Sequence, residues 1–157
     1  LHDVRFVICF ACLFLISHRA RFSDLSNVVK TSLEESFLIT KVHKTKTSGR
    51  LGDRLAPELM GLRFLFSDLD WFRVGLERRE KMETPLGDWP ILPCYSRSED
   101  GKVVWSKQAA GVRSFNIHFN DLLEFLGKER ASSHTCKTSL LRFACIGGLE
   151  VNDRAAL

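Results

Sequence analysis

The most apolar stretch of the chain runs from Phe6 to Ile16, reads FVICFACLFLI and contains no charged residue. It is much shorter than the about 20 residues that a membrane-spanning helix needs. An apolar segment of this size after His2 and Arg5 is also compatible with a signal peptide, but no small-x-small cleavage pattern follows it. We therefore expect a buried helix. The alternative is a membrane or secretory signal on an unrelated helical domain.

The next part of the chain changes from helical to strand-like spacing. We expect one or two helices over 6–29, broken near Ser17, with Leu25, Val28 and Val29 on one face of the second. The β-branched, apolar segment 36–42 (SFLITKV) predicts a strand. A polar turn over 44–50 then leads to another short strand.

The second half alternates helices with irregular chain. Ser67 is a good N-cap and basic residues follow at the other end, which predicts a helix over 68–82. After a segment rich in proline, 91–95 and 102–105 can pair as a hairpin. Apolar spacing from Phe115 to Leu126 predicts a third long helix that closes near Gly127. A fourth begins at Ser132 or Ser133. The fold class is therefore α+β and mostly α, with a small antiparallel sheet between the first and second helical groups.

Composition narrows the class of protein. The chain has 157 residues, of which 45% are hydrophobic and 27% are charged, so disorder, collagen and a multi-span membrane protein are excluded. Length and the absence of repeats or linkers favour one domain over 1–157. The net charge of +4 permits an anionic partner without identifying it. Five cysteines make an odd set, which favours reduced thiols in an intracellular protein.

The start of the fourth helix carries two groups suited to binding an anion. His134 and Lys137 are three residues apart and share a helix face. A cation in the first turn is locally unfavourable, because unpaired N–H groups already carry partial positive charge there. The same groups together would suit a phosphate. The alternative is an exposed Lys beside a capping His.

Two further basic segments precede the predicted fourth helix in the sequence. Arg21 and Asp24 are three residues apart in RFSDL, where a simple pairing between them is the alternative to an exposed functional Arg. In KVHKTKTSGR, Lys44 and Lys46 share one face of an extended segment. A solvated charge run is the default for this second segment.

The order Arg, Lys on a turn, then His-x-x-Lys on a late helix resembles the catalytic domain of the tyrosine recombinase or phage integrase superfamily, including recombinases of eukaryotic mobile elements. Arg21 to Leu25 (RFSDL) is similar to the family's first box. Lys46, or Lys44 as second choice, falls where the family has its catalytic Lys. His134 and Lys137 are similar to the second box, His-x-x-Arg, except at its last position. The resemblance covers about residues 6 to 157.

The resemblance implies DNA strand cleavage and rejoining through a covalent 3′-phosphotyrosyl intermediate, as in site-specific recombination and DNA integration. Arg21 would hold the phosphate, Lys46 would protonate the departing 5′-oxygen, and His134 would donate a hydrogen bond to the phosphate or assist proton transfer. Lys137 gives a point charge where Arg would give two parallel hydrogen bonds. Double-stranded DNA is the implied partner, with a homo-multimer on DNA, no membrane, and a nuclear location if the source is eukaryotic.

The main departure from the family concerns its nucleophile. The single tyrosine, Tyr95, precedes His134, whereas the family's nucleophile follows the second box, so we expect Tyr95 to be a packing or surface aromatic. The chain also begins with Leu rather than Met. We therefore expect either a fragment of a recombinase or a decayed mobile-element relic that binds DNA without cleaving it. This chemistry needs no cofactor and no metal, and the pair Cys9 and Cys12 is expected to pack in the core.

Overall fold

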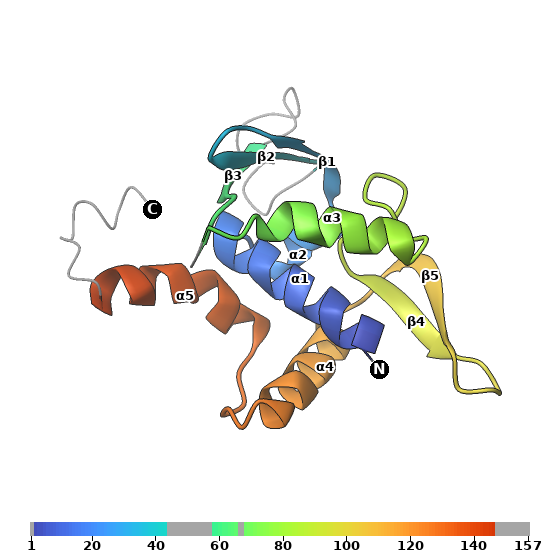
Figure 1. Ribbon diagram of the computed structural model, residues 1–157. Coiled ribbons are helices and arrows are strands. Elements are labelled where there is room, and N and C mark those ends of the chain that lie inside the picture. The colour runs from blue at the N-terminus through green and yellow to red at the C-terminus, as the bar shows by residue number, and fades with distance from the viewer. Residues whose placement is uncertain (1, 44–57, 66–67, 147–157) are drawn as a thin grey trace.

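The computed structural model describes residues 2–43, 58–65 and 68–146, with side chains described as far as residue 139. The helix α1 (His2–His18) runs through the centre of this part of the chain and contacts α2, α3, α4, α5 and β3 (Figure 1). Its buried side chains cover more than half of the helix circumference, and most side chains on the remaining side are half-buried, as is typical of a central core helix. The expectation of a buried helix over 6–16 is confirmed. No helix among the described residues is both long and apolar enough to cross a membrane.

A three-stranded antiparallel sheet follows α1. The short helix α2 (Phe22–Leu25) leads into β1 (Val28–Leu33), and β2 (Phe37–Val42) lies between β1 and β3 (Glu58–Leu62). The predicted strand over 36–42 is confirmed. The prediction that Val28 and Val29 lie on a helix is wrong, since both belong to β1. Their β-branched side chains favour a strand, and pairing with β2 fixes them there.

His18 joins the end of α1 to this sheet. Its Nδ1 lies 3.1 Å from the Phe14 carbonyl oxygen and donates to it, and its Nε2 accepts from the Thr40 hydroxyl at 3.0 Å. Burial lowers the pKa of His18 to about 4, so the ring is neutral at neutral pH. Gly61 of β3 lies against this ring, where a Cβ atom would overlap it. A buried polar contact therefore holds α1 against β2 and β3.

The helix α3 (Trp71–Lys81) begins later than the predicted range 68–82. Its N-cap is Asp70, which accepts from the Arg73 N–H at 3.1 Å, and not Ser67, which lies outside the described residues. Arg63 binds the same carboxylate through Nε at 2.8 Å and Nη2 at 2.6 Å. Asp70 is therefore held in the capping position by a second segment of the chain.

A buried arginine organises the irregular chain after α3. The side chain of Arg79 is fully buried and donates to the carbonyl oxygens of Thr84 (2.7 Å), Ile91 (2.8 Å) and Pro90 (3.0 Å). Burial lowers the pKa of Arg79 to about 10, so the guanidinium remains charged at neutral pH. The proline-rich segment is thus held by one side chain.

The remaining elements agree with the sequence patterns. The strands β4 (Pro93–Arg97) and β5 (Val103–Ala109) form the expected hairpin. The helix α4 (Val112–Phe125) ends before Gly127, and α5 spans Ser133–Ile146. Buried residues from all these helices join one hydrophobic cluster. The described structure is therefore a mixture of helices and two small antiparallel sheets, which confirms the α+β class.

Candidate functional site

Three of the candidate residues meet in one cleft. Arg21, His134 and Lys137 line an open cavity of about 410 Å³. Phe22, Ser23 and Ser133 complete its lining, and we call these six residues the cationic cleft. The other two candidates, Lys44 and Lys46, lie outside the described residues. Two segments far apart in the sequence thus place their basic side chains around the same space.

The charges of the cleft have the same sign. Arg21 and His134 are exposed, Lys137 is half-buried, and no acidic residue is among the lining residues. Within the described ranges, neither Arg21 nor Lys137 forms an ion pair. Unpaired cations placed together repel one another, so an anion between them would lower the free energy of the site.

Arg21 lies just before α2, in extended backbone (φ −82°, ψ 154°), and not on the helix as the sequence suggested. Its backbone N–H donates to the buried Asp24 carboxylate at 2.8 Å. The simple pairing of the Arg21 and Asp24 side chains is therefore wrong. The ring of Phe22 packs on Phe115 of α4, with centroids 5.2 Å apart, which anchors the segment. The backbone is fixed while the guanidinium stays available to a ligand.

Two asparagines of α4 position the start of α5. Asn120 Nδ2 donates to the Ala131 carbonyl oxygen and Asn120 Oδ1 accepts from the Ala131 N–H, both at 2.9 Å. Asn116 Oδ1 accepts from the Ser133 N–H at 3.0 Å. Asn116 thus caps the start of α5. The alternative interpretation of the sequence assigns this capping role to His134. Sequence reasoning missed both residues, because their partners are brought close only by the turn between α4 and α5.

The inner face of α5 is held by packing. Cys136 is buried against α1, and a hydrogen bond joins its free thiol to the free thiol of Cys12. This bond, with burial, raises the pKa of Cys12 well above its usual value. Cys9 is half-buried beside the same core, so the expectation that Cys9 and Cys12 pack in the core is confirmed. Among the described residues, no group of three or more His, Cys, Asp or Glu side chains could hold a metal ion.

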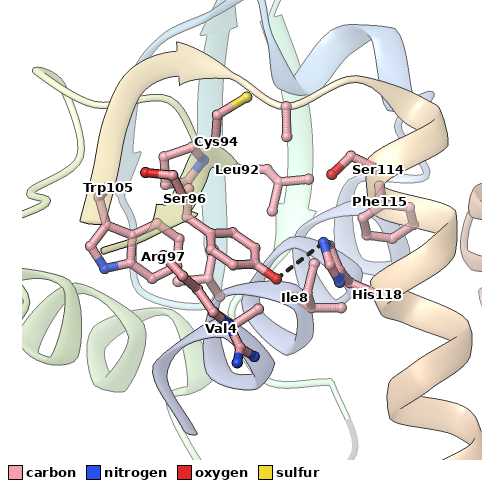
Figure 2. Close-up of a pocket in the computed structure, with 14 residues that line it drawn as sticks. Val4, Ile8, Leu92, Cys94, Ser96, Arg97, Trp105, Ser114, Phe115 and His118 are labelled. Atoms are coloured by element: carbon pink, nitrogen blue, oxygen red, sulfur yellow. Dashed lines mark hydrogen bonds between the residues drawn. The ribbon is translucent and has the colours of Figure 1, made fainter. Parts of the chain in front are cut away.

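Tyr95 lies in a different cavity. This cavity, of about 280 Å³, lies between α1, the β4–β5 hairpin and α4, and we call it the Tyr95 cavity (Figure 2). Tyr95 is half-buried against Trp105, and its hydroxyl lies 3.2 Å from His118 Nε2. The expectation that Tyr95 is a packing or surface aromatic is confirmed, and Tyr95 does not line the cationic cleft. Comparison with protein-family models gave no match to this chain, and comparison with curated proteins gave none either.

Proposed function

We propose that this protein binds the phosphate backbone of double-stranded DNA through the cationic cleft. In the complete protein, we propose that the cleft holds the phosphodiester for strand cleavage and rejoining, as in the tyrosine recombinases that the sequence resembles. The observation that supports this proposal is the convergence of Arg21 with His134 and Lys137 on one cavity. Arg21 and His134 match the two boxes of that family, and Lys137 stands where the second box has Arg.

The side chains suit the chemistry of a phosphodiester. The planar guanidinium of Arg21 can donate two parallel hydrogen bonds to the non-bridging oxygens. Lys137 adds a point charge, and His134 adds a donor from the same helix face. Charge grows on these oxygens as the phosphorus is attacked, so fixed cationic donors stabilise the transition state more than the ground state. Lys46 is the proposed general acid for the departing 5′-oxygen.

The second candidate function is DNA binding without catalysis. It is favoured by the position of Tyr95, whose hydroxyl bonds to His118 in a separate cavity and so lies away from the cleft. A nucleophile would have to reach the cleft from elsewhere. The two candidates share the same phosphate contacts and differ only in the covalent step.

Binding is tested by the salt dependence of affinity for a duplex DNA probe. We expect R21A and K137A each to weaken binding about tenfold and to reduce the slope of log K against log salt by about 1, because each removes one phosphate contact. R113A is the matched control, since Arg113 is exposed and lines neither cavity. K137R should bind the duplex probe more tightly than the parent chain, because Arg can donate two parallel hydrogen bonds to a phosphate. Equal losses for R21A, K137A and R113A would contradict a localised site.

The covalent step is tested with the full-length protein and a nicked duplex that traps a cleaved strand. Strand cleavage predicts a protein–DNA adduct that survives denaturing electrophoresis and is lost in R21A. DNA binding with no adduct in the parent protein would remove the catalytic proposal and leave the binding function.

A further inference from the structure

The Tyr95 cavity is a second candidate site, with chemistry unlike that of the cationic cleft. It shares no lining residue with that cleft. Figure 2 shows α4 on one side with Ser114, Phe115 and His118, the β4–β5 hairpin on the other with Trp105 and Arg97, and Val4 and Ile8 of α1 beneath. Its volume of about 280 Å³ is just below the usual range for drug-sized ligands, so a compact molecule fits it.

The floor of the Tyr95 cavity is apolar and buried. Val4, Ile8, Leu92 and Phe115 belong to the buried residues of the protein and are at most 6% exposed. Their positions are set by the packing of α1 against α4 and the hairpin, so the floor exists before any ligand binds. An apolar molecule that displaces water from such a surface gains about 25 cal/mol for each Å² that it buries.

Aromatic rings form the upper part of the wall. The rings of Tyr95 and Trp105 lie with centroids 5.6 Å apart at 58°, and the Tyr95 ring lies 5.2 Å from that of His118. The dashed line in Figure 2 marks the bond between the Tyr95 hydroxyl and His118 Nε2. His118 Nδ1 lies 3.6 Å from Asp121 Oδ2, while Nε2 faces the Tyr95 hydroxyl. The Tyr95 ring is therefore held in one orientation.

The phenol remains neutral in this setting. Burial raises the pKa of Tyr95, the positive charge of Arg97 partly offsets this, and the negative charge of Asp121 raises it further. The hydroxyl therefore stays protonated at neutral pH. The charges of Arg97 and Asp121 therefore both contribute to the electrostatic potential at Tyr95 in the cavity wall.

Arg97 is the cation without a protein partner at this site. Its side chain is exposed at the cavity lining, and within the described part of the chain it forms no ion pair and no hydrogen bond. A guanidinium beside an apolar cavity matches the planar, singly charged carboxylate group. Asp121 lies on the other side of His118, and its negative charge repels a doubly charged phosphate more strongly than a singly charged carboxylate.

We propose that the Tyr95 cavity binds a small aromatic or branched aliphatic carboxylate, with its apolar body against Ile8, Phe115 and Trp105 and its carboxylate on Arg97. Tyr95 and His118 are positioning residues that shape the wall. This site is independent of the DNA-binding function proposed above.

The test uses phenylacetate and its uncharged analogue phenylacetamide, which have nearly the same shape. Binding is followed by NMR from the Ile8 methyl groups and the Trp105 indole N–H. We expect R97Q to weaken phenylacetate binding about tenfold, since a hydrogen bond to a charged group is lost, and to leave phenylacetamide binding unchanged. R113Q is the matched control and should change neither.

A second variant tests the place of binding. Ser114 is half-buried in the cavity wall, so S114L should fill the space and weaken both probes while the thermal unfolding midpoint stays close to that of the parent. Equal affinity for the two probes, or an equal effect of R97Q and R113Q, would overturn the proposal. So would the absence of shifts at Ile8 and Trp105 at millimolar phenylacetate.

Discussion

Two regions of the molecule place ionisable side chains in opposite settings. In the interior, Arg79 and His18 are buried, and the protein itself supplies the partners of their nitrogens. In the cationic cleft, Arg21 and Lys137 are accessible, and the described residues supply no counter-charge.

The difference separates polar side chains that hold the fold together from cations that are open to a ligand. A buried polar or charged group is tolerated only when its hydrogen bonds are made, so the Arg79 cation and the neutral His18 ring stabilise the fold, and their burial closes them to a ligand. The cations of the cleft keep their donors free. The following predictions test this contrast, beginning with the largest expected effect.

The largest effect is expected from R79A. This change leaves three carbonyl oxygens without their donor and opens a cavity, so we expect a loss of about 4 kcal/mol in the free energy of unfolding. Urea unfolding measures it. Lysine should not rescue, because an ammonium cannot reproduce the planar fork. R78A is the control: Arg78 pairs with Asp3 at the surface, and its loss should cost less than about 1 kcal/mol. Similar losses for R78A and R79A would break the contrast.

The next effect is a dependence of stability on pH. The pKa of His18 falls from 6.5 in the unfolded chain to about 4 in the folded protein. Above pH 6.5 the ring is neutral in both states and its contribution is complete. As the pH falls from 6.5 to 4, the unfolded state takes up the proton first, and about 3 kcal/mol of stability is lost.

Urea unfolding at several pH values measures this slope, and H18N provides the comparison. The variant should be less stable at pH 7 but should lack most of the slope between pH 6.5 and 4. A slope of the same size in H18N would assign the effect to other groups.

A smaller loss is expected from G61A. The added methyl group would overlap the His18 ring, which cannot move without breaking its bonds to Phe14 and Thr40. We expect about 2 kcal/mol, typical of an overfilled core. G111A is the control: nothing lies within 4 Å of its Cβ position, so its cost should stay below about 1 kcal/mol. Thermal unfolding of both variants tests whether the buried polar contact is tightly packed.

The smallest effect on stability is expected from N120A, which bears on the cleft. It removes the two bonds that fix Ala131 before α5, at a cost of about 1 kcal/mol. Because these bonds position His134 and Lys137, affinity for duplex DNA should also fall severalfold. The exposed Gln108 gives the control variant Q108A. An unchanged DNA affinity in N120A would show that the cleft does not depend on this anchor.

Several helices and the hairpin follow from local pattern. The apolar run in α1 and the apolar spacing of α4 were sufficient to predict those helices, and the segments 91–95 and 102–105 were sufficient to predict the hairpin. The boundary of α3 and the strand β1 were not predicted. Asp70 caps α3 in a position that is fixed by its bond to Arg63. Val28 lies in a strand because it pairs with Val42 of β2. Both partners come from other segments of the chain.

The sequence by itself determined the α+β class, the central buried helix and the residue types of the candidate site. It could name Arg21, His134 and Lys137, because charge and helical spacing are properties of short segments. Only the tertiary structure decided that these residues share one cleft, that Tyr95 lies elsewhere with His118, and that Arg79 is a structural cation. The physical reason is that burial and pairing depend on contacts between distant segments of the chain. These contacts distinguish Arg79, which is buried and holds a loop, from Arg21, which is exposed and open to a ligand.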